Sequence, residues 1–190
     1  MAILQILKYP DPRLREVSKP VTNFNAQLQS FAKDLFETMY DEGGIGLASP
    51  QVGELIRVVA IDTRPRDPES RHEDVTTELE SQISQPLLLI NPEIIKGHGK
   101  TKYSEGCLSV PSFYEDVERF EKIELKYQDI NGQVKTLVTD GLLSICIQHE
   151  LDHLDGTLFI DHLSLVRLNK IKNSIKKNGY PEKKKESVKA

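Results

Sequence analysis

The chain has 190 residues, of which 38% are hydrophobic and 28% charged, and its formal net charge at pH 7 is −4. This length and composition predict one globular domain and exclude a fibrous repeat or a wholly disordered chain. Two cysteines are too few for a disulfide framework. We recognise neither a secretory signal nor a stretch of the roughly 18 apolar residues that span a membrane, so we expect a soluble, cytoplasmic protein.

The small net charge conceals an uneven distribution. Residues 165–190 carry nine basic and two acidic side chains, a net of +7, which leaves sixteen basic and 27 acidic side chains, a net of −11, in the rest of the chain. Val166, Asn169 and Asn173 follow helical spacing up to Gly179, which predicts a helix before a lysine-rich tail. We therefore divide the chain into a main domain, 1–165, and a basic C-terminal helix and tail, 166–190.

The first half of the chain contains one predicted helix and two predicted strands. Residues 25–40 carry apolar side chains three and four positions apart, which predicts an amphipathic helix that ends at Gly43-Gly44. Residues 55–62 are rich in branched side chains and predict a buried strand. Residues 64–85 are strongly charged and predict a surface loop, and 87–90 predict a short strand that Asn91-Pro92 terminates.

The second half predicts a hairpin and a helix. Apolar and polar residues alternate over 123–127, and Asn131-Gly132 then leads into 134–138, a pattern typical of two strands joined by a tight turn. Residues 140–155 return to helical spacing and end before Gly156. The sum is an α+β fold: short, mostly antiparallel strands packed around a central helix, with an N-terminal helix and a C-terminal helical tail.

The central helix carries a metal-binding pattern, His149-Glu150-Leu151-Asp152-His153. Histidines four positions apart lie about 6 Å from each other along one helical face, so both rings reach one cation. Glu150, next to the first histidine, is then placed to act on metal-bound water. The alternative is a chance pattern on a solvated helix face.

The two cysteines separate a catalytic from a structural site. Cys146 precedes His153 by seven residues, about 10 Å along the helix axis, so one ion hardly binds both and Cys146 is expected to pack as a small apolar residue. Cys107 lies in a separate segment and can approach from the side. A site of Cys107, His149 and His153 with a vacant fourth position follows, which is a hydrolytic arrangement.

A glycine-rich loop occupies residues 43–51. It is not a dinucleotide-binding turn, because that motif runs strand, glycines, helix, whereas here a helix precedes and a strand follows. Glycines allow the backbone to approach a ligand closely, and Gln51 offers an amide N–H to an oxyanion. A plain connecting turn is the alternative.

Three separated motifs, Gly44–Gln51, Glu105–Ser109 and Gln148–His153, occur in this order and together resemble peptide deformylase. Segments 9–15 and 155–161 share the resemblance, which covers residues 3–165. It implies a hydrolase that removes the formyl group from the N-terminal formylmethionine of newly synthesised polypeptides and releases formate.

The resemblance also implies a role for each matching residue. The metal ligands are Cys107, His149 and His153, and they hold one Fe2+ per chain, with Zn2+, Ni2+ or Co2+ as substitutes. Metal-activated water attacks the formyl carbon with Glu150 as general base and then acid. The remaining implied residues are the catalytic Gln51, Leu108 (through its backbone N–H) and Gly46, and the substrate-binding Ile45, Gly44, Leu142, Ile145 and Cys146.

Some of these assignments have alternatives. Ordinary core packing explains Ile45, Leu142, Ile145 and Cys146 equally well. Ser49 stands where the family most often has alanine, and the chain has serine at 112 where glycine is common. A zinc peptidase shares the His-Glu-x-x-His pattern, and a structural zinc closed by both cysteines and both histidines is a second, non-enzymatic hypothesis.

The resemblance and the charge pattern together predict the partners. We expect a monomer that acts on N-formylmethionyl nascent peptides and does not bind membranes. The basic tail suggests a hypothesis of ribosome docking through phosphate contacts. A frayed, solvated terminus is the alternative for this segment.

Overall fold

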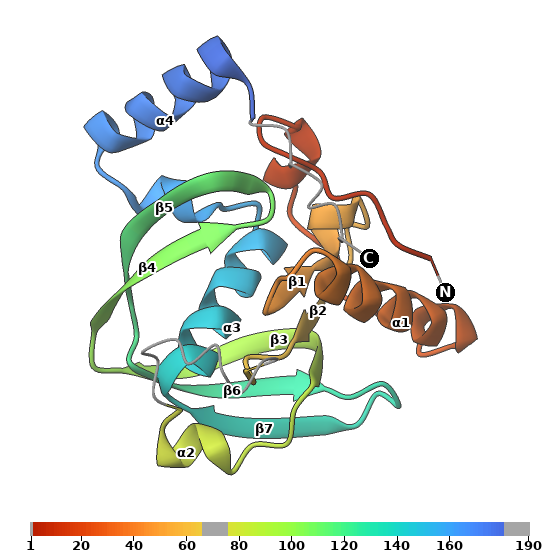
Figure 1. Cartoon of the computed structure of the whole chain (residues 1–190). Helices are drawn as coiled ribbons and strands as arrows, with labels where there is room; N and C mark the ends of the chain where they lie inside the picture. Colours follow the sequence, from red (N-terminus) through yellow and green to blue (C-terminus); the bar gives the residue numbers. More distant parts are fainter. Residues whose placement is uncertain (1, 66–75, 181–190) are drawn as a thin grey trace, which may run out of the picture.

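The computed structural model describes residues 2–65 and 76–180 (Figure 1). Its helices and strands confirm the predicted α+β class and are, in chain order, α1 (Ala26–Asp41), β1 (Gly46–Ala48), β2 (Val58–Ile61), α2 (Glu78–Ser81), β3 (Leu87–His98), β4 (Thr101–Cys107), β5 (Val110–Arg119), β6 (Lys122–Gln128), β7 (Val134–Thr139), α3 (Gly141–Leu154) and α4 (Leu165–Asn178). No helix of the described part is long and apolar enough to cross a membrane.

An antiparallel sheet with the strand order β1-β2-β3-β6-β7 lies between α1 and α3. Strand β2 shows how the sequence produces these layers, because successive side chains of a strand point to opposite faces. Val58 and Ala60 pack in the cluster that includes α1, whereas Val59 and Ile61 pack in the cluster that includes α3. All four side chains are fully buried, so the sheet forms the middle of the domain.

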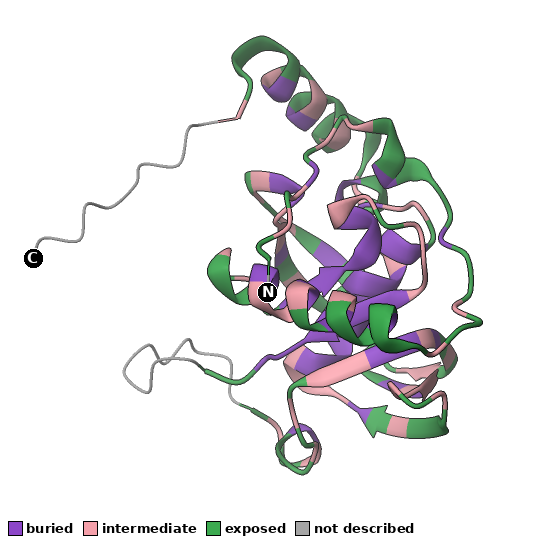
Figure 2. Ribbon diagram, turned by 90° about the vertical axis from the view of Figure 1, so that its right-hand side faces the viewer, coloured by how far each residue is buried: buried purple, intermediate pink, exposed green. Residues whose placement is uncertain are grey.

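Helix α3 is enclosed on nearly every side. Its residues from Leu143 to Leu151 are continuously buried, as the burial colours at the centre of Figure 2 show. The two-stranded sheet of β4 and β5 covers a side of α3 that the large sheet does not (Figure 1), and the Phe120 N–H donates to the Gln148 side chain at 2.8 Å. A helix buried in this way tolerates polar side chains only where they find partners.

The predicted helices and hairpin are confirmed in position. The Asn25 side chain caps α1 by accepting from the Leu28 N–H, and β6 pairs with β7 across the turn at Gly132. Gly156 follows α3 with a φ of +71°, the left-handed conformation that suits glycine after a helix. Gly179 ends α4.

The prediction that Asn91-Pro92 ends a short strand is wrong. Strand β3 continues through both residues to His98, with a register shift between Ile90 and Glu93. Such a bulge accommodates a proline, which has no N–H to give to the ladder. Asn91 adopts a φ of +50°, and its side chain bonds to the backbone of Val21, which fixes the irregular turn from outside the sheet.

Other boundaries also differ from the prediction. The strand expected at 55–62 begins at Val58, and the hairpin of β4 and β5 was not predicted at all. The predicted loop at 64–85 contains the short helix α2 and otherwise lies partly outside the described residues, as does the lysine-rich end of the tail.

Helix α4 packs on the body of the domain. Ile171 and Ile175 are 3% and 8% exposed and belong to the cluster that contains Val117 and Phe159. Tyr180, just beyond the helix, packs against the same cluster, to whose edge Cys107 also belongs. Burial, followed by the nearby Cys107 sulfur, raises the pKa of Tyr180 to about 12. One face of the basic helix is therefore part of the core behind Cys107.

Candidate metal centre and active site

Three side chains converge to form a candidate metal site. Cys107 ends β4, and His149 and His153 stand one turn apart on α3; their ligand atoms all lie within 4.8 Å of one another. The Cys107 Sγ is 3.2 Å from the His153 Nε2. Burial raises the pKa of the Cys107 thiol, but the two histidine rings outweigh it and hold that pKa well below its ordinary value. The donor set, a thiolate and two imidazoles, fits a transition-metal ion.

A buried carboxylate orients the first histidine. Glu105 Oε2 lies 2.9 Å from the His149 Nδ1, so Nδ1 carries the proton and Nε2 is left for the metal. Arg119 donates to both Glu105 oxygens at 2.7 and 2.9 Å. Burial raises the pKa of Glu105, but its bonds to Arg119 and His149 prevail and lower it, so this carboxyl is ionised.

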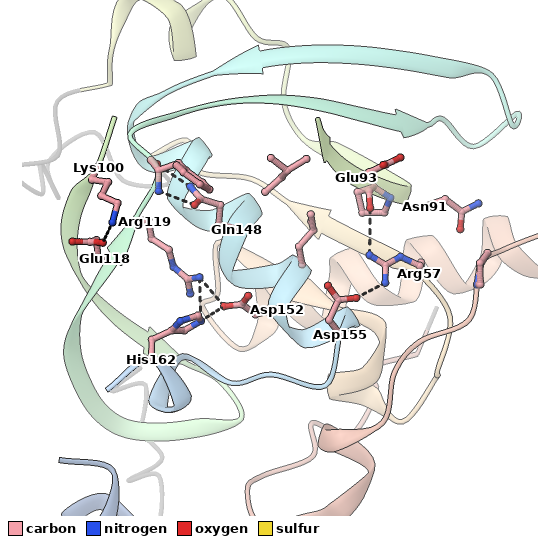
Figure 3. Close-up of a pocket in the computed structure, with 15 residues that line it drawn as sticks. Arg57, Asn91, Glu93, Lys100, Glu118, Arg119, Gln148, Asp152, Asp155 and His162 are labelled. Carbon is pink, nitrogen blue, oxygen red and sulfur yellow. Dashed lines mark hydrogen bonds and ion pairs between the residues drawn. The ribbon is translucent and has the colours of Figure 1, made fainter. Parts of the chain in front are cut away.

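The ion pair continues along α3 to Asp152. Arg119 also donates to Asp152 Oδ2 at 2.6 Å, and that oxygen lies 2.7 Å from the His162 Nε2 (Figure 3). His162 belongs to no sequence motif and lies 37% exposed at the end of this chain of contacts. His162 therefore contacts Asp152, the residue before His153, and is not one of the clustered metal ligands.

Glu150 lies beside the metal site with an unpartnered oxygen. The side chain is 4% exposed, and its Oε2 is buried without a hydrogen bond. Burial raises the pKa of Glu150, which suits a group that must accept and return a proton near neutral pH. Strand β1 passes so close that a Cβ on Gly46 would lie 2.4 Å from Glu150 Oε1. Glycine at this position therefore keeps the space for Glu150.

Gln51 points its amide nitrogen towards the metal site. Its Oε1 accepts from the Ala48 N–H at 2.8 Å, which fixes the amide orientation. Its Nε2 then donates to Ser109 Oγ at 3.2 Å and lies 3.7 Å from the Cys107 Sγ. The Gln51 residue is 1% exposed. A substrate oxygen that accepts from Nε2 would therefore take the place of Ser109 Oγ as its partner.

A cavity of about 370 Å³ opens onto this site. The residues predicted to bind substrate all line it, and they are Gly44, Ile45, Leu142, Ile145 and Cys146. Leu108 and Gly46 line it as well. Burial raises the pKa of Cys146 well above its ordinary value, so this thiol stays protonated and packs as a small apolar group, in keeping with the sequence prediction.

The sequence analysis missed an aromatic part of the cavity wall. Tyr103, Phe113 and Tyr114 line the cavity from β4 and β5. A Cβ on Gly106 would lie 2.5 Å from the Tyr114 ring, so the ring packs directly on the strand that ends in Cys107. A glycine immediately before the cysteine was the available signal, because it marks a close approach.

The two serines that depart from the family pattern are both accommodated. The buried Ser49 hydroxyl donates to the Ile56 carbonyl. Ser112 adopts a φ of +70°, a conformation that glycine enters without steric cost. The serine therefore strains the backbone slightly beside the cavity.

A second, larger cleft of about 710 Å³ lies along the Asp152 side of α3 (Figure 3). Charged side chains line it in pairs, namely Arg57 with Asp155, Lys100 with Glu118, and Arg119 with Asp152. None of the clustered metal ligands lines this cleft. Two of these ligands, Cys107 and His149, line the smaller cavity instead.

An α+β domain with a cluster of one partly buried cysteine, two buried histidines and an adjacent carboxylate defines a metal-dependent hydrolase. The family model described as "Polypeptide deformylase" matches residues 3–169. The chain belongs to this family of peptide deformylases, as its relatives also show. It is 46% identical over 177 residues to the peptide deformylase of Alkalilimnicola ehrlichii, covering 93% of this chain and 91% of the relative, and 47% identical over 178 residues to that of Cellvibrio japonicus, covering 93% and 96%.

Solved structures agree with this assignment. The peptide deformylase of Legionella pneumophila aligns with a TM-score of 0.79 at 39% identity, covering 93% of this chain and 95% of that one. The enzyme of Ehrlichia chaffeensis in complex with actinonin aligns with a TM-score of 0.81 at 34% identity, covering 94% and 99%.

The orientation of His149 by Glu105 leads to a testable prediction. In Glu105→Gln the acceptor of the His149 proton weakens and Arg119 loses one of its two carboxylate partners, so we expect metal affinity to fall by about 10- to 100-fold. Competition with a chelator measures this loss. Glu118→Gln, which changes an exposed carboxylate on the same hairpin, is the matched control and should bind metal like the unchanged chain. Equal metal retention in both variants would contradict the role of Glu105.

Proposed function

We propose that Glu150, Gln51 and the backbone N–H of Leu108 carry out the reaction of this family, removal of the N-formyl group from polypeptides, at the site of Cys107, His149 and His153. The supporting observation is that Cys107 and His149 line one cavity together with Glu150, whose Oε2 is buried without a partner. The ligand atoms of Cys107, His149 and His153 lie within 4.8 Å of one another. When bound, the metal ion supplies a Lewis acid that polarises the formyl oxygen and lowers the pKa of water.

Glu150 moves the proton in this mechanism. Its carboxylate accepts a proton from the attacking water, and the acid so formed returns it to the departing amine. The burial that raises the pKa of Glu150 makes its carboxylate a better acceptor of the water proton than an exposed carboxylate would be. The side chain lies beside Gly46, in the wall of the substrate cavity.

Gln51 and Leu108 stabilise the negative charge that develops on the formyl oxygen. The Ala48 N–H holds the Gln51 carbonyl, so the Nε2 donor is fixed before substrate arrives. A donor fixed in advance needs no reorganisation during the reaction, and removal of one such donor typically costs about 10²-fold in rate. The largely apolar wall formed by Ile45, Leu142 and Ile145 suits the linear methionine side chain.

We propose Fe2+ as the ion, one per chain, with Zn2+, Ni2+ or Co2+ able to replace it. A thiolate with two imidazoles suits each of these ions, so the donor set supports the proposal without selecting iron. One chain supplies the whole donor set, which supports a monomer as the active unit. The cytoplasm, where nascent chains are made, is the proposed location.

We assign separate roles to residues 1–165 and 166–190. The first segment contains every proposed catalytic and substrate-binding residue and is the proposed deformylase domain. The second contributes Ile171 and Ile175 to the core, and its sequence carries a net charge of +7 with residue 165 included. Ribosome docking through RNA phosphates would bring the site close to formylated nascent chains.

The activity is tested with formyl-Met-Ala. We expect Met-Ala and formate as products, and Glu150→Ala should retain its metal while turnover falls by at least about 10²-fold, because the proton acceptor is lost. Formate release and metal content are measured on the same preparations. Cleavage of the Met-Ala bond would instead support the peptidase alternative, and an active Glu150→Ala would remove Glu150 from the mechanism.

The identity of the metal is tested by elemental analysis of protein purified without oxygen. We expect about one iron per chain, held by one thiolate and two imidazoles. Zinc at full occupancy in such a preparation, with undiminished activity, would contradict the assignment of iron.

The docking role is tested by substituting Lys183, Lys184 and Lys185 with glutamine. Ribosome cosedimentation should weaken and depend less steeply on salt, because fewer phosphate contacts are made. Turnover of formyl-Met-Ala should stay within about twofold, since none of these lysines is among the proposed catalytic or substrate-binding residues. Truncation after Leu165 is a poorer test because it removes the buried Ile171 and Ile175. Unchanged cosedimentation of the triple variant would exclude docking through these lysines.

A further inference from the structure

Glu80 is a buried carboxylate that none of the catalytic roles above uses. It lies in the short helix α2 and is 3% exposed. Its Oε1 accepts from the Thr63 hydroxyl at 2.7 Å. Its Oε2 is buried without a hydrogen bond of ordinary geometry. Burial raises the pKa of Glu80, while the Thr63 hydroxyl and then the backbone N–H groups of Leu142 and Leu143 act to lower it. The carboxyl therefore faces the first turn of α3.

Helix α3 lacks a local cap at this end. Asp140 occupies the N-cap position, but its side chain makes no capping hydrogen bond. It accepts instead from the Thr77 hydroxyl, at the N-terminus of α2. The first N–H groups of a helix have no partner within the helix, and a carboxylate beside them is stabilising. Glu80 thus occupies, from a separate segment, the place that a capping side chain would take.

Gly141 shows how closely this segment approaches α3. It has a φ of +61°, and a Cβ at this position would lie 2.6 Å from Glu80 Oε2 and 3.0 Å from the Thr77 Cγ2. Any other residue would therefore collide with the carboxylate and strain the backbone. The absence of a side chain at Gly141 and the burial of the Glu80 carboxylate both reflect one close contact between α2 and the start of α3.

The contact between Glu80 and the start of α3 lies closer to the wall of the substrate cavity than to the metal ligands. Leu142 in the first turn of α3 and Ile145 at the start of the second line the cavity of about 370 Å³. His149 lies seven residues after Leu142, about 10 Å further along the axis. A displacement of the first turn would therefore change the pocket for the substrate side chain before it reached the metal.

We propose that Glu80 is a positioning residue for substrate selection: held by Thr63, it fixes the first turn of α3 and with it the Leu142 and Ile145 wall that receives the methionine side chain. The proposal rests on the proposed function, since it concerns the pocket of that same site. It assigns a role to the end of the charged segment 64–85, which the catalytic mechanism leaves without one.

The test compares Glu80→Ala with Glu78→Ala, which removes an exposed carboxylate from the same turn of α2. Loss of the cap should raise KM for formyl-Met-Ala about fivefold and lower the preference for formyl-Met-Ala over formyl-Ala-Ala by a similar factor. In Glu80→Ala, kcat and metal content should stay within about twofold, because the ligands lie further along the helix. Glu78→Ala should match the unchanged chain in every measurement.

Amide hydrogen exchange gives a readout that does not depend on activity. Glu80→Ala should speed exchange in peptides covering 141–147 and leave 149–154 unchanged. Thr63→Val removes the hydroxyl that donates to Glu80 Oε1 and that also bonds to the Gln85 side chain. It is a milder variant that serves if Glu80→Ala does not fold, and it should shift KM and exchange in the same direction.

Three results would overturn the proposal. The first is that Glu80→Ala and Thr63→Val both keep the KM and the substrate preference of the unchanged chain. The second is that kcat and metal content fall together with the midpoint of thermal unfolding. The third is that amide exchange becomes faster over the whole of α3. The last two would show a merely structural role. If the unchanged chain releases no formate from formyl-Met-Ala, the proposed function fails, whereas the exchange pattern still reports whether Glu80 holds the first turn.

Discussion

The buried ion pair between Glu105 and Arg119 is the interaction on which the rest of the site depends. Both side chains are about 5% exposed, and charges buried this deeply are tolerated only with good geometry and further hydrogen bonds. Glu105 satisfies its second oxygen partly on His149, and Arg119 extends to Asp152 on the same helix. The pair therefore joins β4, β5 and α3 at one fixed position. Since Cys107 follows Glu105 by two residues, that position also brings the thiol to the two histidines.

A second constraint is the close approach of β1 to α3. A Cβ on Gly46 would overlap Glu150 Oε1 at 2.4 Å and the Cys146 Sγ at 2.8 Å. The same closeness excludes water from Glu150 and raises its pKa by burial. Packing and acid-base chemistry thus have one cause here, because the glycine that permits the contact also creates the environment that the carboxyl needs.

The sequence predicted what local spacing determines. Histidines four apart on a helix must share a face, and Cys146 was too far along that helix to join them, so the donor set followed from periodicity. The fold class, α1, α3 and the last hairpin followed in the same way. The roles of Glu150, Gln51 and Leu108 stay predictions, since geometry alone does not measure turnover.

What the sequence did not predict depends on contacts between distant segments. The hairpin of β4 and β5 alternates polar residues on its exposed face, and its buried positions include Glu105 and Arg119, which single-sequence reasoning assigns to the surface. The continuation of β3 through Pro92 depends on Asn91 bonding to Val21. Ion pairs and bulges of this kind have no signature in a hydrophobic pattern, because the residues that stabilise them lie tens of positions away.

The two cavities differ in whether their charged side chains have partners. In the cleft of about 710 Å³, Arg57, Arg119 and Lys100 each have a carboxylate partner, so entry of a ligand would have to break an existing ion pair. At the cavity of about 370 Å³, Glu150 Oε2 is buried without a partner. A buried, unsatisfied oxygen costs folding free energy, and the proposed reaction gives the Glu150 oxygen a partner in the water proton. The larger cleft instead contains the far end of the ion-pair chain from His149, so its closed pairs stabilise the geometry on which the smaller cavity depends.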